Sequence, residues 1–313
     1  SVTQWLGQDR QGYTLPQGLY VSRAAFEFDT RVMLKRVWLY ACTVAHVKNS
    51  GDFYLFEMAN TSVIIVRGRD GDVRAFHNSC AHRGAKLCSQ AKGSMPRIMC
   101  PYHQWTYGLD GKLLAARNMP EGFEKADHGL QPARLENIGG LIFICLSDDP
   151  PTIEHARADI AERVAIYNLE HCKVAVQDDL VEAANWKLVM EPFLEGYHVQ
   201  RLHINSIGPQ GLDFFDDIVP KVERFGPHIR QISGRGKYTP ELLEDPAINI
   251  RKVVTIVYNL FPNTVVITSP YYISVMIIMP TATGKTNVDY YMLTETAPDN
   301  PKAEELYAKS FAV

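Results

Sequence analysis

The sequence lacks an apolar segment long enough to cross a bilayer, and it lacks a basic block. Its longest apolar region, residues 253–280, is interrupted by polar residues and prolines, whereas a spanning helix needs about 20 apolar residues in a row. The 32 Lys and Arg residues are balanced by 35 Asp and Glu residues. These absences exclude a membrane span and a general affinity for nucleic acid.

Cysteine is also scarce. Six cysteines in 313 residues are too few for a disulfide framework. The N-terminal residues do not show the basic-then-apolar pattern of a signal peptide, so we expect a cytoplasmic protein. The hydrophobic fraction of 46% is high enough for a folded core, and the length predicts about two domains.

Residues 41–149 predict a small antiparallel β domain. Short segments rich in β-branched and aromatic residues alternate with turns, and the pairs Asp70-Gly71 and Asp110-Gly111 are typical of tight hairpins. We expect strands at 53–58, 62–67, 73–77 and 141–146. Residues 1–40 predict a lead-in with a helix over 28–38, packed on the C-terminal domain.

Residues 150–313 predict a second domain, which begins at the Asp-Asp-Pro-Pro boundary of residues 148–151. Helices are expected at 153–167 and 185–200, and a strand at 174–183. Strand-like segments at 253–258, 264–268, 273–279 and 287–296 predict an antiparallel meander. A last helix begins near residue 301. The fold class is therefore α+β.

Two loops of the first domain each contain one Cys and one His. Cys80-Ala81-His82 and Cys100-Pro101-Tyr102-His103 are separated by 17 residues, and thiolates with imidazoles favour soft or borderline metals. A structural zinc ion would take all four side chains in one tetrahedron. A Rieske [2Fe–2S] cluster would take two Cys on one iron and two His on the other. Interleaved Cys and His favour the cluster, because each loop then supplies both irons.

Three neighbours of these ligands are candidates for an outer shell. We expect Tyr102 to donate a hydrogen bond to a ligand thiolate and Trp105 to pack beneath the loop and limit solvent. Arg83 precedes a glycine that lets backbone N–H groups approach sulfur. Such contacts tune the potential of a cluster. Plain core packing is the alternative for Tyr102 and Trp105.

A second candidate metal site lies in residues 185–203. Glu191, Glu195 and His198 share one face of the expected helix. His203 follows His198 by five residues, or about 140° of helical rotation, so both can bind one ion only if the helix distorts or ends between them. Two His and one carboxylate form the facial triad of non-haem Fe(II) oxygenases, which leaves positions open for O₂.

Together the two segments resemble the Rieske non-haem iron oxygenases, in particular their catalytic α subunit. The resemblance implies an N-terminal antiparallel β Rieske domain followed by a helix-grip catalytic domain with an antiparallel sheet. It implies that four side chains hold the [2Fe–2S] cluster: Cys80, His82, Cys100 and His103.

The resemblance also implies a mononuclear Fe(II) held by His198, His203 and one carboxylate. It implies that Glu195 links this iron to a Rieske histidine of the neighbouring subunit in a homotrimer. In the family, the third ligand follows the last strand of the sheet. Asp299, Glu304 and Glu305 come too early after that strand, so we expect the ligand beyond Val313.

The family implies electrons from NADH or NADPH, delivered by a reductase or a ferredoxin, and O₂ as oxidant. Monohydroxylation, dihydroxylation and demethylation stay open, as does a β subunit. The substrate is an aromatic compound, as in aromatic hydrocarbon catabolism, or an N-methyl or quaternary ammonium compound. Glu195, where many members have Asp, is similar to members that act on carnitine and betaines. Glu191 replaces an Asn that is frequent in ring-hydroxylating members. The competing hypothesis is a zinc ribbon fused to a helix-grip ligand-binding domain without catalysis.

Overall fold

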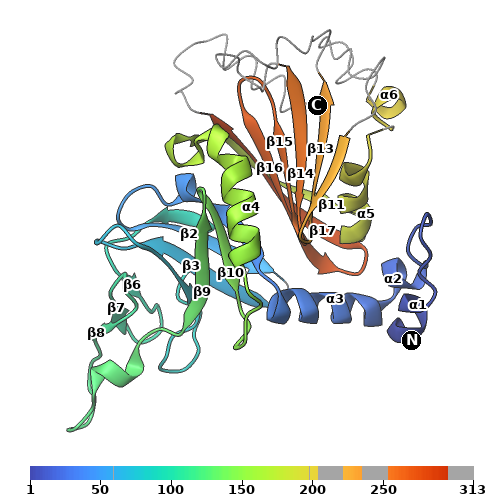
Figure 1. The fold of residues 1–313 in the computed structure, drawn as a ribbon. Helices are drawn as coiled ribbons and strands as arrows, with labels where there is room; N and C mark the ends of the chain where they lie inside the picture. Colours follow the sequence, from blue (N-terminus) through green and yellow to red (C-terminus); the bar gives the residue numbers. More distant parts are fainter. Residues whose placement is uncertain (59, 197, 204–220, 235–252, 295–313) are drawn as a thin grey trace. The chain divides into compact units, whose positions relative to one another are not determined.

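The computed structural model describes residues 1–58, 60–196, 198–203, 221–234 and 253–294. The chain divides into two compact units (Figure 1). The β unit comprises residues 32–153 and 163–170. The mixed unit comprises residues 1–31, 154–162 and 171–313, so the first helices group with the C-terminal sheet. No helix in these described ranges is both long and apolar enough to cross a membrane.

The β unit contains a seven-stranded antiparallel sheet and a small three-stranded sheet. The larger sheet has the order β1-β10-β9-β4-β3-β2-β5. Its strands are β1 (Leu39–Thr43), β10 (Leu141–Cys145), β9 (Pro132–Ile138), β4 (Val73–His77), β3 (Thr61–Arg67), β2 (Asp52–Met58) and β5 (Lys92–Ser94). The smaller sheet contains β6 (Ile98–Met99), β7 (Thr106–Tyr107) and β8 (Leu113–Ala115). Short 3₁₀ helices are η1 (Val44–His46), η2 (Lys125–His128), η3 (Ala165–Tyr167) and η4 (Leu169–His171), the last of which ends at the boundary with the mixed unit.

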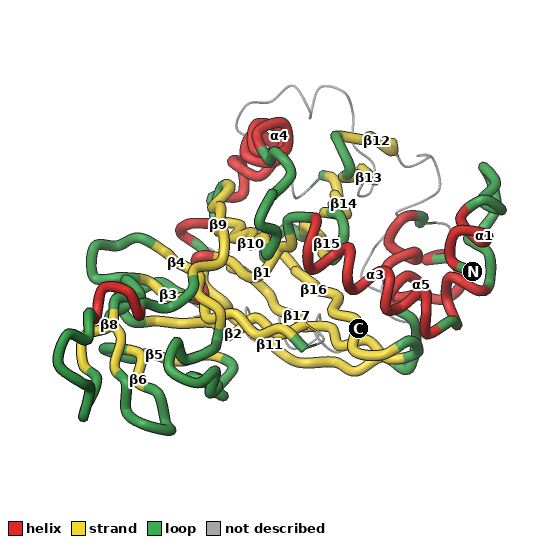
Figure 2. Tube along the Cα trace, turned by 90° about the horizontal axis from the view of Figure 1, so that it is seen from below, coloured by secondary structure: helices red, strands yellow, loops and turns green. Residues whose placement is uncertain are grey.

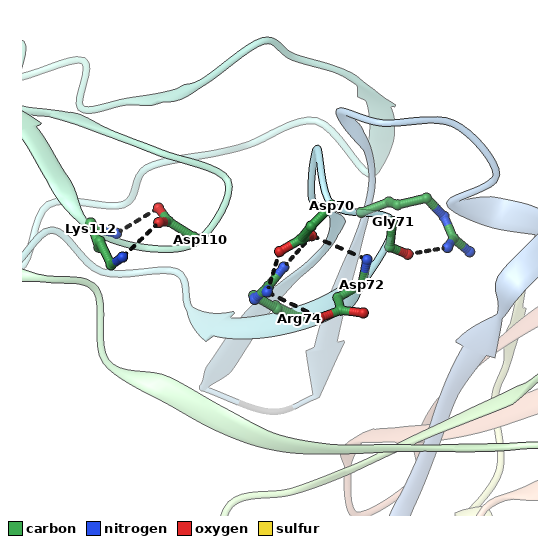
Figure 3. A network of polar contacts seen from close by, with 7 residues as sticks. Asp70, Gly71, Asp72, Arg74, Asp110 and Lys112 are labelled. Carbon is green, nitrogen blue, oxygen red and sulfur yellow. Dashed lines mark hydrogen bonds and ion pairs between the residues drawn. The ribbon is translucent and has the colours of Figure 1, made fainter.

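Both predicted Asp-Gly turns are present, and polar contacts close them (Figure 3). Between β3 and β4, Gly71 has a φ of 89°, a left-handed conformation that favours glycine. Arg74 donates to both carboxylate oxygens of Asp70 at 2.8 and 2.6 Å, and Arg67 donates to the Gly71 carbonyl at 2.6 Å. The hydrogen bond with Arg74 lowers the pKa of Asp70 to about 2. In the second turn, the carboxylate of Asp110 accepts a hydrogen bond from the backbone N–H of Lys112 at 3.2 Å.

The mixed unit is built on a seven-stranded antiparallel sheet in the order β11-β17-β16-β15-β14-β13-β12. The strands are β11 (Lys173–Glu182), β17 (Lys285–Thr294), β16 (Ile273–Ala282), β15 (Thr264–Thr268), β14 (Val254–Leu260), β13 (His228–Gly234) and β12 (Lys221–Phe225). Strands β14 to β17 are consecutive neighbours, which confirms the predicted meander. The expected last helix, near residue 301, lies outside the described residues.

The described helices of this unit are α1 (Val2–Leu6), α2 (Gly18–Val21) and α3 (Arg23–Arg36, which ends in the β unit) near the N-terminus, α4 (Glu154–Val164), and then α5 (Trp186–Met190), η5 (Glu191–Leu194) and α6 (Val199–Leu202) in the segment of the expected iron site. Figure 2 shows α1, the start of α3 and α5 on one side of the unit. The side chains of α5 and η5 pack on sheet residues Val265, Ile278 and Val288.

The prediction of one helix over residues 185–200 is wrong. The structure has α5, then η5, then an extended residue, then α6. Pro192 stands in the first turn of η5, where it has no N–H for an α-helical hydrogen bond. Glu195 is extended, with φ −140° and ψ 158°. The helix therefore ends between Glu191 and His198, and these two residues do not share a helix face.

Candidate metal centres

The two Cys-His loops of the β unit have the same local construction. Each loop closes with a hydrogen bond from the backbone N–H four residues later to the cysteine carbonyl. The bond from Gly84 N to Cys80 O measures 2.8 Å, and the bond from Gln104 N to Cys100 O measures 3.1 Å. Gly84 and Gln104 both have positive φ, of 70° and 59°. Gly84 adopts this conformation freely, whereas it is uncommon for a residue such as Gln104.

The four expected cluster ligands are arranged with sulfur inside and imidazole outside. Cys80 and Cys100 are 3% and 1% exposed and belong to the hydrophobic core of the β unit. His82 is half-buried and His103 is exposed, and their ring centroids are 4.7 Å apart. Burial lowers the pKa of His82, and the charges of His103 and Arg83 add to this, which favours the neutral ring that a metal requires. The donor set fits a Rieske cluster.

The hydroxyl group beside a ligand sulfur belongs to Tyr107 and not to Tyr102. Tyr107 is fully buried, and its oxygen lies 3.1 Å from Cys80 Sγ and accepts from Ala81 N at 3.2 Å. A cysteine that holds a cluster is a thiolate without a proton, so the Tyr107 hydroxyl would be the donor in this contact. Burial, followed by the bond with Cys80, raises the pKa of Tyr107. The prediction missed Tyr107, although strand alternation places it on the same face as Trp105.

Tyr102 and Trp105 contact the imidazoles instead. The exposed ring of Tyr102 stacks on His103, with centroids 3.8 Å apart. Trp105 is buried and lies parallel to His82 at 4.8 Å, with 10° between the ring planes. Phe123 packs edge-on against Trp105, with centroids 5.6 Å apart. Each imidazole is therefore held in place by one aromatic neighbour.

The segment between the two loops is fixed by a buried amide that sequence reasoning missed. Asn78 donates to Ser62 Oγ at 3.0 Å and to the Cys88 carbonyl at 2.7 Å. Its oxygen accepts from the N–H groups of Leu87 and Cys88 at 3.0 and 2.9 Å. The thiol of Cys88 contacts the carbonyl of Gln90 at 3.5 Å. Cys88 is thus engaged through its backbone.

In the mixed unit, Glu195, His198 and His203 come together at α6. One carboxylate oxygen of Glu195 accepts from His198 N at 3.3 Å, and the other contacts His198 Nδ1. This contact leaves Nε2 as the ring nitrogen available to a metal, the usual carboxylate–histidine–metal arrangement. The rings of His198 and His203 are 5.5 Å apart between centroids. Burial, followed by the charge of His198, lowers the pKa of His203.

Glu191 points to the N-terminal segment. Its carboxylate accepts from the Tyr20 hydroxyl at 2.6 Å, and burial together with this carboxylate raises the pKa of Tyr20 to about 12. Asn185 caps α5 through Lys187 N at 3.1 Å. Its amide donates at 2.8 Å to each of the carbonyls of Tyr20 and Thr283. These bonds hold the start of α5 against the first helices.

A buried ion pair reinforces this attachment. The ammonium of Lys187 contacts Asp29, and their side chains are 10% and 16% exposed. Asp29 also accepts from Trp186 Nε1 at 3.1 Å. The segment that leads to the candidate iron ligands is therefore bound to α3 through two side chains.

The third iron ligand stays a prediction. Asp299, Glu304 and Glu305 lie outside the described residues, as does any carboxylate beyond Val313. Among the described residues, no group of three or more His, Cys, Asp or Glu side chains is arranged so that it could hold one metal ion. For the mononuclear iron, the fit rests on two adjacent imidazoles, of which His198 is oriented by a carboxylate.

Two family models match the chain in the order of its units. Residues 37–132 match the Rieske [2Fe-2S] domain, and residues 169–312 match the ring hydroxylating alpha subunit (catalytic domain). The chain belongs to the Rieske non-haem iron oxygenases. Its fold, a β domain followed by a catalytic domain with an antiparallel sheet, is confirmed as α+β.

Among curated members of this oxygenase family, the chain is 40% identical over 205 residues to the glycine betaine monooxygenase oxygenase subunit of Chromohalobacter salexigens. The aligned region covers 64% of this chain and 46% of the relative. The chain thus spans about half the length of such relatives.

Two solved structures show the same fold. One is the quaternary ammonium Rieske monooxygenase CntA with L-carnitine (23% identity, TM-score 0.80, 95% of this chain and 80% of that chain). The other is naphthalene 1,2-dioxygenase from Rhodococcus sp. with indole (20%, TM-score 0.81, 99% and 80%). Since one fold is found with such different bound molecules, it does not identify a substrate for this chain.

Proposed function

We propose that this chain is the oxygenase subunit of a Rieske monooxygenase that demethylates a small quaternary ammonium compound of the betaine class. The observation that carries the proposal is the 40% identity to a glycine betaine monooxygenase oxygenase subunit. Glu195, where many family members have Asp, points to the same substrate class.

The reaction converts glycine betaine, O₂, two electrons and two protons into dimethylglycine, formaldehyde and water. One C–H bond of a methyl group becomes C–OH, and the C–N bond then breaks with release of formaldehyde. Cys80, His82, Cys100 and His103 would hold the cluster that supplies single electrons. His198, His203 and a carboxylate as third ligand would hold the iron that activates O₂.

The protein side chains set the geometry for this chemistry. The two buried cysteines keep the sulfurs away from water, while His82 and His103 place imidazole edges toward the outer side of the loops. Glu195 holds the proton at His198 Nδ1, which fixes the ring and its tautomer. In a homotrimer, the same carboxylate would meet a Rieske histidine of the next subunit. A reductase, directly or through a ferredoxin, would supply electrons from NADH or NADPH.

The test is a single turnover with purified protein that carries both metals and a reduced cluster. Glycine betaine should yield dimethylglycine and formaldehyde in equal amounts. The isostere 3,3-dimethylbutyrate keeps the carboxylate but has an uncharged carbon in place of the quaternary nitrogen. It should bind at least about tenfold more weakly, because it lacks the cationic attraction to aromatic faces and carboxylates. Hydroxylation of an aromatic acid with no demethylation of betaine would refute the proposal.

A further inference from the structure

Two buried amides converge on one main-chain oxygen beside the iron site. Gln231 Nε2 donates to the Phe193 carbonyl at 2.7 Å, and Asn259 Nδ2 donates to the same oxygen at 2.8 Å. Gln231 is 5% exposed and Asn259 is 3% exposed. Burying an amide costs free energy unless it is hydrogen-bonded, so this pair needs the Phe193 carbonyl as its partner.

The two amides come from neighbouring strands of the catalytic sheet. Asn259 on β14 pairs with Ile229 on β13, and Gln231 lies two residues after Ile229. Residues two apart on a strand point to the same face, so the two side chains are diagonal neighbours on the face that η5 covers. Phe193 is partly buried and packs against an apolar cluster that includes Val265 and Ile278 of this sheet.

The orientation of Asn259 also depends on this carbonyl. Its Oδ1 atom is buried and has no hydrogen-bond partner among the residues that the structure describes. The opposite orientation would place Oδ1 against the Phe193 oxygen, with two acceptors facing each other. The amide group therefore keeps an unpartnered oxygen while its NH₂ group faces Phe193.

The Phe193 carbonyl lies at the end of η5, just before the segment that carries Glu195 and His198. It lies in the last turn of η5, where helix carbonyls have no partner within the helix. Two residues later the chain is extended at Glu195, and α6 begins at Val199, next to His198. Two donors on one oxygen fix the peptide plane from which the chain leaves the sheet toward the metal ligands.

From this juxtaposition we propose that Gln231 and Asn259 are positioning residues of the iron site, which act through the Phe193 carbonyl on Glu195 and His198. The inference rests on the proposed function only in that iron binds at His198 and His203. Neither amide touches the iron ligands in the described contacts. Their role is to hold the segment that presents those ligands.

The test uses Gln231→Met, Asn259→Leu and the double variant, with Gln177→Met as matched control. Gln177 lies on β11, at the opposite end of the sheet, and donates to Asp289 at 2.9 Å. The control also loses a side-chain amide bond in the same unit. The readouts are the Fe(II) dissociation constant, the electron paramagnetic resonance spectrum of the Fe(II)–nitric oxide complex, and the melting temperature.

Each single variant keeps one donor on the carbonyl, so Fe(II) affinity should fall by only about two- to threefold. The double variant leaves a buried carbonyl without a donor, and the loss should reach roughly ten- to a hundredfold, more than the product of the single effects. The nitrosyl spectrum should broaden in the double variant and stay unchanged in Gln177→Met, even where both lose thermal stability.

Purely multiplicative losses, or an equal loss in the control, would assign these amides to general stability and overturn the inference. Fe(II) binding and the nitrosyl spectrum need no substrate. A failed betaine assay therefore overturns the proposed substrate alone, while wild-type Fe(II) binding in the double variant overturns the positioning role alone.

Discussion

The bond between Tyr107 and Cys80 predicts how one hydroxyl group sets the reduction potential of the cluster. The variant Tyr107→Phe removes the oxygen that lies 3.1 Å from Cys80 Sγ and keeps the buried ring. A reduced cluster carries one more negative charge than an oxidised cluster, so it gains more from a donor on its sulfur. Losing the donor favours the oxidised form and lowers the potential.

The magnitude follows from the strength of such a bond. A hydrogen bond to a charged group contributes about 1.5–3 kcal/mol, and only the difference between the two redox states affects the potential. If that difference is about 1 kcal/mol, the potential falls by roughly 40 mV, since a tenfold change in the equilibrium constant of a one-electron reduction corresponds to about 59 mV. The phenol is fully buried, so water does not replace the lost donor.

A redox titration followed by electron paramagnetic resonance or circular dichroism measures this shift. The comparison is Tyr102→Phe, which removes an exposed hydroxyl group but keeps the ring stacked on His103; its potential should equal that of the wild type. An unchanged potential in Tyr107→Phe, or an equal shift in both variants, would refute the assignment of the hydroxyl bond to Tyr107.

Three further outcomes are expected. Glu195→Gln keeps the shape and an acceptor for the imidazole but loses the charge, so metal analysis should find both metals while product formation nearly disappears; full activity would remove the bridging role. Asp29→Ala leaves the buried ammonium of Lys187 unpaired, which should destabilise the mixed unit by about 3–5 kcal/mol in denaturant unfolding, and a loss below about 1 kcal/mol would contradict the buried pair. The hydrogen bond with Lys221, followed by the one with Arg230 on β13, lowers the pKa of Glu223 to about 2. The ionised Glu223 therefore contributes fully to the free energy of unfolding above its ordinary pKa, and this contribution, about 1 kcal/mol after allowance for solvent screening, is lost as pH falls toward 2. Glu223→Gln should abolish this part of the acid sensitivity of unfolding.

Local patterns made much of this fold predictable. The predicted strands at 73–77 and 264–268 coincide with β4 and β15, because their side-chain pattern and flanking turns are contained in the segment itself. The Cys-His loops were visible for the same reason, since each loop closes within five residues of its cysteine.

Features that depend on distant segments were not predictable. The end of η5 is bonded by Gln231 and Asn259, which donate to the Phe193 carbonyl from strands far along the chain. The choice of Tyr107 over Tyr102 depends on which ring the β-unit core encloses. Hydrophobic periodicity contains no information on either point.

The amide of Asn185, which joins the carbonyls of Tyr20 and Thr283, constrains how the nascent chain folds on the ribosome. Tyr20 leaves the exit tunnel early, but Asn185 follows 165 residues later and Thr283 another 98 residues after that. The three-part contact is therefore complete only after roughly 13–50 s at translation speeds of about 5–20 residues per second. The β unit is encoded between these partners and has its whole sheet available sooner. During this interval, apolar side chains of the N-terminal segment such as Leu19, which is buried in the folded protein, stay exposed to solvent. A chaperone would therefore matter most at this stage.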